Sequence, residues 1–242
     1  KLIQYPKGFD VGNRRRGKLA LVLLEDAAIR LGVQHAKGKL VREGSEEDLQ
    51  RQWDAWCSIW LEPLAASLLR GSTRQKWILS AHFLNHLFVY SNRAMHELLY
   101  HLTKPTLHMP STSDTSASRS FLRAPAVLCV LCVGKQMGLV STSGLEGVGI
   151  DLEQPLPWSS EEQIVNVPAK LLRIWVDTPH HEVSVGALGL IAASRLSAMP
   201  LSKDELDVCA DFLGSSFQGV SPESRTAIRG FYQQLLSRLR AS

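Results

Sequence analysis

The chain lacks a strong charge of either sign, a long apolar run and a regular cysteine pattern. Its 27 Lys and Arg residues against 23 Asp and Glu residues give a net charge of +4, which excludes an acidic tail protein and a histone-like polycation. The longest apolar stretch, 124–133, is about half of the roughly 20 residues that a membrane helix needs. Four cysteines without regular spacing exclude a disulfide framework and favour a reducing intracellular compartment.

What is present is the composition of an ordinary globular protein. Hydrophobic residues make up 45% of the chain and charged residues 21%, so one or two domains with a sizeable core are expected. The sequence begins with Lys1 and shows no cleavable signal segment. We therefore expect a soluble, cytoplasmic piece of a longer protein, with no membrane span.

Apolar residues recur at the 3.6-residue period along most of the chain, which predicts an all-α fold. One helix is marked by Leu84 and Phe88, and another begins near Ser91. Residues 122–137 are apolar nearly all round and predict a helix that is enclosed by its neighbours. Between these helices, residues 103–120 are rich in Ser, Thr and Pro and predict a flexible loop, and residues 141–158 predict a second loop.

Two helical hairpins are expected in the last third of the chain. Pro168 can start the first, which breaks at residues 177–181 and returns along an apolar stripe. Ser202 and Glu205 form a capping box at the start of the second, and Pro222 begins its return helix. The stripes predicted for these two helices consist of Leu206, Cys209, Ala210 and Leu213, and of Ile228, Phe231, Tyr232, Leu235, Leu236 and Leu239.

The hairpins repeat every 35 to 40 residues, which is the period of HEAT or armadillo repeats. We therefore predict an α-solenoid of antiparallel helix pairs, with a compact bundle as the alternative. Residues 1–102 would form N-terminal repeats with a basic first third, residues 103–120 the flexible loop, and residues 121–242 the C-terminal repeats.

Three motifs could carry chemistry, and each has a structural interpretation that we favour. His82 and His86 have a metal-binding spacing, and a neighbouring helix carries two further histidines, but position 83 lacks the Glu of the zincin motif. Cys129 and Cys132 form a C-x-x-C in wholly apolar surroundings, where thiols stay protonated and pack as small hydrophobes. The Gly-rich residues 144–149 have neither the strand before nor the helix after them that a dinucleotide site requires. We predict no metal, no cofactor and no catalytic residue.

Charge is unevenly distributed along the chain. Residues 1–42 hold ten basic and three acidic residues, whereas the remainder holds 17 basic and 20 acidic ones. Residues 13–18, which include four basic side chains, lie at a predicted helix start. Their side chains and the free backbone N–H groups of the helix could together bind phosphate groups. A solvated surface is the alternative, and Arg225 and Arg229 form a smaller second candidate. The predicted nucleic-acid-binding residues are Arg14, Arg15, Arg16, Lys18, Lys37 and Lys39.

Three segments carry a resemblance to a known family. They are the pattern Trp56-x-x-x-Trp60-x-x-Pro63-Leu64, the run from Glu182 to Ile191, and the C-terminal hairpin from Lys203 to Arg238. In these segments the chain resembles the thyroid adenoma-associated protein (THADA) family of helical-repeat proteins. It departs from that family at Ser184, where such repeats usually carry an Arg that donates a hydrogen bond between repeats, and it lacks the family's Arg-Arg-x-Ala-Gly-x-Pro-like motif.

The resemblance implies a function without catalysis. Fungal members of the family are the regulatory partner of an FtsJ-type methyltransferase that modifies the 2′-O-ribose at position 32 of the tRNA anticodon loop. By this resemblance the chain would help to position tRNA, and S-adenosylmethionine would bind the partner enzyme. The alternative is an adaptor that binds proteins only, since animal members of the family are linked to energy balance and to regulation of a calcium pump.

Overall fold

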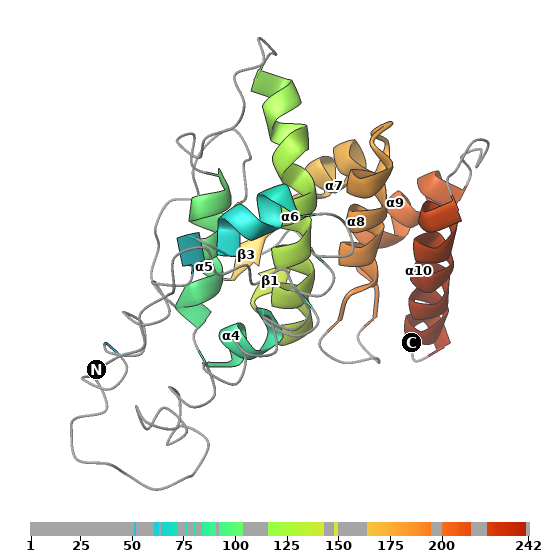
Figure 1. The fold of residues 1–242 in the computed structure, drawn as a ribbon. Helices are drawn as coiled ribbons and strands as arrows, with labels where there is room; N and C mark the ends of the chain where they lie inside the picture. The colour runs from blue at the N-terminus through green and yellow to red at the C-terminus, as the bar shows by residue number, and fades with distance from the viewer. Residues whose placement is uncertain are drawn as a thin grey trace, which may run out of the picture. The chain divides into compact units, whose positions relative to one another are not determined.

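The computed structural model describes residues 51, 61–62, 64–71, 76, 80, 84–90, 92–103, 116–142, 148–149, 164–194, 200–213 and 222–240. The chain divides into two compact units, and each is described here by itself (Figure 1). The first comprises Lys1–Pro110 and Leu156–Glu161, and the second comprises Ser111–Pro155 and Glu162–Ser242. The fold is all-α, as predicted.

In the first unit, helix α4 (Asn85–Tyr90) packs on helix α5 (Asn92–Thr103). Leu84 and Phe88, the apolar positions that mark the first of these helices in the sequence, are buried as predicted, and Ala94 and Leu98 of α5 are buried as well. Leu64 lies in a further helical stretch, residues 64–70, and is buried as well. The 3.6-residue period was therefore a sound guide to the core of this unit.

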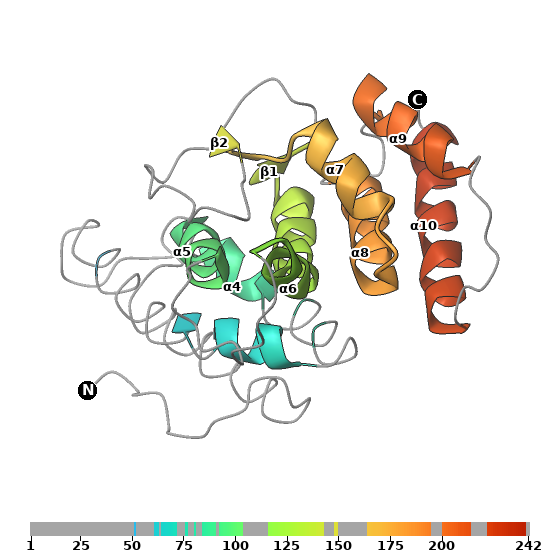
Figure 2. The same cartoon turned by 90° about the horizontal axis from the view of Figure 1, so that it is seen from above.

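The second unit contains five helices among the residues that the structure describes. Helix α6 (Ser116–Met137) is followed by α7 (Ala169–Val176), α8 (His181–Ala192), α9 (Lys203–Leu213) and α10 (Pro222–Arg240). Helix α6 packs on α8 and α8 packs on α10, while α7 packs on both α8 and α9. Figure 2 shows the result as one row of helices, α6, α8 and α10, with α7 and α9 in a second row. This is the stacking of a helical-repeat protein, in which each hairpin covers the apolar face of the previous one.

Helix α6 is longer at its N-terminus than the composition predicted. It begins at Ser116, so the last residues of the predicted loop 103–120 are helical. The composition of that stretch indicated little burial, but Ala, Arg and Ser differ in intrinsic helix propensity by at most about 0.7 kcal/mol. The scarcity of apolar residues at 116–120 therefore did not exclude a helix there.

Gly138 ends α6. Its φ of 80° lies in the left-handed region, which glycine enters without steric cost. The Gly138 N–H donates to the Lys135 carbonyl at 3.1 Å, and the Leu139 N–H donates to the Gly134 carbonyl at 2.8 Å. These two bonds form a Schellman motif, and they place Lys135 in the last turn of α6.

A small parallel sheet, absent from the sequence prediction, follows α6. Its strands are β1 (Val140–Ser141), β2 (Val148–Gly149) and β3 (Val165–Asn166), in the order β1-β3-β2. Val165 pairs with both Val140 and Val148. Strands of two residues are too short to show the alternating pattern by which a strand is recognised in a sequence.

The two predicted hairpins are present, with corrections to the faces that they bury. Helices α7 and α8 are separated by the expected break, and the apolar stripe predicted for the returning helix is buried at Val183, Ala187, Leu190 and Ile191. On α9 the predicted stripe is correct at Cys209 but wrong at Leu206 and Ala210, which are exposed; Glu205, Val208 and Phe212 are buried with Cys209 instead. On α10 the stripe is correct at Phe231 and Leu235 but wrong at Leu236 and Leu239, which are exposed.

Candidate functional site

The predicted nucleic-acid-binding residues lie outside the residues that the structure describes. They are Arg14, Arg15, Arg16, Lys18, Lys37 and Lys39. The smaller candidate is placed, because Arg225 and Arg229 are both exposed on α10. Side chains four residues apart share a helix face, so the two guanidinium groups can reach one ligand.

The histidines are placed only in part. His96 is buried and His101 half-buried on α5, whereas the structure does not describe His82 or the side chain of His86. Within the described part of the chain, no group of three or more His, Cys, Asp or Glu residues could hold a metal ion. None of the described helices is both long and apolar enough to cross a membrane.

Two of the described cysteines, Cys132 and Cys209, behave as the sequence predicted. Burial, reinforced by the neighbouring Cys129, raises the pKa of the Cys132 thiol to about 12. Burial, reinforced by Glu205, raises the pKa of Cys209 to about 11. Both thiols therefore stay protonated at neutral pH, and the Cys132 Sγ lies 3.8 Å from the Gly186 carbonyl on α8.

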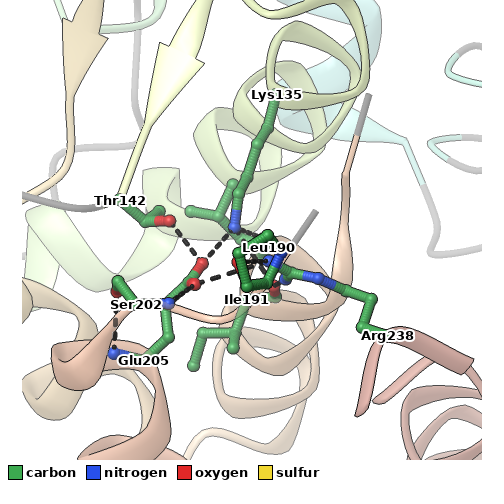
Figure 3. A network of polar contacts seen from close by, with 8 residues as sticks. Lys135, Thr142, Leu190, Ile191, Ser202, Glu205 and Arg238 are labelled. Atoms are coloured by element: carbon green, nitrogen blue, oxygen red, sulfur yellow. Dashed lines mark hydrogen bonds and ion pairs between the residues drawn. The ribbon is translucent and has the colours of Figure 1, made fainter. Parts of the chain in front are cut away.

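Among the described residues, the most organised cluster of charged groups is a buried joint at Glu205, formed by Lys135, Thr142, Ser202, Glu205 and Arg238 (Figure 3). Ser202 and Glu205 form the predicted capping box at the start of α9. The Ser202 N–H donates to Glu205 Oε2 at 2.8 Å, and the Glu205 N–H donates to Ser202 Oγ at 3.2 Å. This box fixes the carboxylate beside the first turn of α9, where the helix dipole stabilises a negative charge.

Lys135 reaches the joint from the last turn of α6. Its Nζ donates to Glu205 Oε1 at 2.5 Å and to the carbonyl oxygens of Leu190 and Ile191 at 3.0 and 3.1 Å. Those carbonyls belong to the last turn of α8, which has no partners for them within the helix. One ammonium group therefore caps α8 and neutralises Glu205 at the same time.

Arg238 reaches the joint from the other end of the row, on α10. Its Nη1 donates to the Ile191 carbonyl at 2.6 Å, and its Nη2 donates to the Pro200 carbonyl at 2.9 Å. The same Nη2 lies 3.6 Å from Glu205 Oε2, and both side chains are about 95% shielded from solvent, at 5% and 4% exposed. Thr142, which directly follows β1, completes the joint by donating to Glu205 Oε1 at 2.6 Å.

The electrostatics of the joint follow from these contacts. Burial lowers the pKa of Lys135, and the attraction of Glu205 only partly offsets this effect. Burial on its own would raise the pKa of Glu205, but Lys135 and the hydrogen bonds from Thr142 and Ser202 hold it below its usual range. Glu205 is therefore kept as a carboxylate that accepts hydrogen bonds, which suits a structural joint between helices.

Only part of this joint could be predicted from the sequence. The capping-box spacing indicated Ser202 and Glu205, whereas Lys135, Thr142 and Arg238 were not predicted. Arg238 carried a signal, since it lies three residues after Leu235, which is on the buried face of α10. The position of Lys135 was also informative, because it lies three residues before Gly138, the glycine that ends α6, and so falls in the last turn of that helix.

Ser184 also has a defined role. Its Oγ donates to the Val176 carbonyl at 2.8 Å, and Val176 is the last residue of α7. The residue that replaces the arginine of similar repeats therefore satisfies an unpaired carbonyl within its own hairpin.

Comparison with protein-family models gives a match over most of the chain. The family model described as Trm732, TPR repeats, matches residues 56–242, which is well over half of the chain. The chain belongs to this family. No match was found among curated proteins or among solved structures.

Membership of the Trm732 family makes this a helical-repeat protein related to tRNA modification. The matched range includes every helix from α4 to α10, and therefore the whole buried joint. The family description gives its repeats as TPR, where the hairpin length led us to expect HEAT or armadillo repeats. All three types are arrays of stacked antiparallel helix pairs. The predicted basic residues from Arg14 to Lys39 precede the matched range.

Proposed function

We propose that this chain is a non-catalytic scaffold that supports 2′-O-ribose methylation of tRNA at position 32 of the anticodon loop. A separate FtsJ-type methyltransferase carries out the chemistry and binds S-adenosylmethionine. The observation that carries the proposal is the match of residues 56–242 to the Trm732 family. The resemblance to the THADA family, based on segments from Trp56 to Arg238, supports the same function and supplies the position on tRNA.

The architecture of the second unit supports a scaffold role. Stacked hairpins present long surfaces whose residues stay at fixed spacing, which suits a protein that holds a large ligand against a partner. The most organised polar cluster among the described residues, at Glu205, is occupied by contacts between helices and serves stability. In this proposal the tRNA contacts come from the basic residues near the N-terminus, with Arg225 and Arg229 as a second contact.

A reconstituted methylation assay tests the proposal. The methyltransferase, S-adenosylmethionine and a tRNA transcript are incubated with and without this protein, and 2′-O-methylation at position 32 is measured by mass spectrometry of nuclease fragments. We expect methylation only when both proteins are present. A tRNA with a 2′-deoxyribose at position 32 is the matched control, because it keeps the shape of the substrate and lacks the acceptor oxygen.

Three outcomes would contradict the proposal. Equal methylation by the methyltransferase alone would show that no scaffold is needed. Methylation by this protein alone would show that it is itself an enzyme. Absence of methylation at position 32 both with and without this protein would make a protein-binding adaptor the better description.

A further inference from the structure

Glu205 contacts the two outer helices of one stacked row, α6 and α10, with α8 between them. In repeat proteins each repeat usually contacts only its neighbours, so one end of an array can open while the other stays folded. Helix α6 packs on α8, and α8 packs on α10. The carboxylate of Glu205, on α9, accepts a hydrogen bond from Lys135 of α6 and lies 3.6 Å from Arg238 of α10.

The middle helix of the row is held by the same two cations. The Ile191 carbonyl, in the last turn of α8, accepts a hydrogen bond from Lys135 Nζ at 3.1 Å and from Arg238 Nη1 at 2.6 Å. The last turns of α6 and α8 and the C-terminal part of α10 therefore meet at one point (Figure 3). Two cations at a helix C-terminus are favourable because the helix dipole is negative there.

Separating α6 or α10 from the row would leave Glu205 without one of its two buried cationic partners. The exposed fractions of the Lys135 and Glu205 side chains are 10% and 4%, so water cannot replace the lost contacts without a larger opening. Removing one member of a buried ion pair is strongly destabilising, because the remaining charge is left uncompensated in the interior. Local opening of α10 therefore disturbs the charge balance at Lys135 of α6.

We propose that Glu205 makes α6, α8 and α10 a single cooperative unit, which opens as a whole and does not fray from α10 inward. Coupling between α6 and α10 passes through this carboxylate in addition to the apolar packing of α8. The inference does not depend on the proposed function, because it concerns only the described contacts of the second unit.

Hydrogen exchange on the intact chain tests the proposal without any substitution. Amides in the last turns of α6, α8 and α10 are followed at increasing concentrations of denaturant, under conditions where exchange reports the opening equilibrium. We expect the three sets of amides to merge into one opening reaction with a shared denaturant dependence. Separate reactions, with α10 opening first and α6 last, would overturn the proposal.

A destabilising substitution on α10 then tests whether amide exchange in α6 responds to it. Leu235 is buried on α10 and is not one of the five residues that form the joint at Glu205. The substitution Leu235→Ala therefore weakens the apolar packing of α10 and leaves the residues of the joint in place. In the otherwise wild-type chain we expect Leu235→Ala to accelerate exchange in α6 and in α10 by the same factor, about tenfold or more for a lost core side chain. Failure of the α6 amides to respond would overturn the proposal.

The same perturbation is repeated in two backgrounds. Glu205→Asp keeps the negative charge but shortens the side chain by one methylene group, so it cannot serve both cations. Val208→Ala is the control, because Val208 is buried one turn away on the same helix and has no charge. We expect Leu235→Ala to accelerate α6 exchange several-fold more in the Val208→Ala background than in the Glu205→Asp background, where only the apolar packing of α8 still couples the two helices. An equal effect in both backgrounds would show that apolar packing carries the coupling, and the proposal would be wrong.

Discussion

The Nζ of Lys135 donates a hydrogen bond to Oε1 of Glu205 at 2.5 Å, across 70 residues of sequence. This contact joins the last turn of α6 to the first turn of α9, and it is buried. The same ammonium group also donates to two carbonyls in the last turn of α8. Lys135 therefore links the C-terminal ends of α6 and α8 to the N-terminal end of α9. The stability of the second unit should depend on this pair more than on any exposed ion pair.

The first prediction concerns the loss of the carboxylate. Glu205→Gln leaves two buried cations without an anion, so we expect the free energy of unfolding to fall by about 3 kcal/mol, the usual cost of breaking a buried ion pair. Asp207→Asn is the matched control, because Asp207 is exposed on the same helix, and its effect should stay within about 0.5 kcal/mol. Urea denaturation followed by circular dichroism measures both. Similar losses in the two variants would contradict the prediction.

The second prediction follows from the lowered pKa of Glu205. A carboxyl group with a lower pKa in the folded than in the unfolded protein binds fewer protons when folded, so stability falls as the pH drops below the ordinary value of 4.5. We expect the unfolding free energy of the wild-type chain to decrease below pH 4.5, and that of Glu205→Gln to decrease less steeply. Urea titrations between pH 3 and pH 7 test this, and parallel curves would contradict it.

Much of the fold could be predicted from the sequence, and the exceptions have a common physical cause. The stripe on α8 was correct because its buried residues are apolar and periodic. On α9 the buried face is rotated by about one residue, because Glu205 is buried by its ion pairs and Leu206 is exposed instead. Apolar periodicity cannot identify a buried face that contains a charge.

The joint itself depends on partners that are far apart in the sequence. The capping box could be recognised because Ser202 and Glu205 are three residues apart, a spacing that one helix turn brings together. Lys135 and Arg238 meet Glu205 only because α6, α8 and α10 stack, and no local spacing encodes that meeting. Ion pairs between residues far apart in the sequence depend on the tertiary fold, so they could not be predicted from this sequence alone.

The third prediction concerns the close approach of α6 and α8. A Cβ added at Gly186 would lie 3.0 Å from Leu128 Cδ1 and 3.3 Å from Leu128 Cβ, whereas one at Gly189 would meet only Cys132 Sγ at 3.9 Å. A Cβ at Gly230 on α10 would meet nothing within 4 Å. Alanine is favoured over glycine within a helix by about 1 kcal/mol, so Gly230→Ala should stabilise the chain by up to that amount.

The three alanine variants together form a matched series. We expect Gly189→Ala to be neutral or stabilising, and Gly186→Ala to be less stable than Gly189→Ala by about 1 kcal/mol, because Leu128 must shift. Chemical denaturation of the three variants gives the order directly. If Gly186→Ala is as stable as Gly189→Ala, the contact between α6 and α8 is looser than the structure shows.

The fourth prediction concerns thiol reactivity. The thiolate is the reactive form, and a pKa of about 12 for Cys132 lowers its thiolate fraction at pH 8 by roughly a thousandfold relative to the ordinary value of 9.0. For Cys209, with a pKa of about 11, the corresponding factor is roughly a hundred. In a variant with Cys57→Ser and Cys129→Ser, an aromatic disulfide reagent should modify both thiols slowly in the native protein and rapidly in urea. Rapid modification of the native protein would contradict the burial of these thiols.

The fifth prediction tests the proposed contacts with tRNA. Each phosphate contact adds about 0.9 to the slope of the logarithm of affinity against the logarithm of salt concentration for duplex nucleic acid. If Arg14, Arg15, Arg16 and Lys18 contact phosphates, changing all four to Glu should weaken tRNA binding and make that slope shallower by about 3 to 4. Fluorescence anisotropy with labelled tRNA at several salt concentrations measures both quantities.

A second variant, at Arg225 and Arg229 on α10, tests whether tRNA binds at particular surfaces or responds only to the net charge of the protein. Arg225→Glu with Arg229→Glu reverses two exposed charges in the described part of the chain, away from the N-terminal cluster in sequence. If both surfaces bind tRNA, this variant should make the slope shallower by up to about 2, because two phosphate contacts are lost. A change in affinity with no change in slope, or equal slopes for all variants, would mean that neither set of arginines contacts phosphates, and the tRNA surface would then lie elsewhere on the protein.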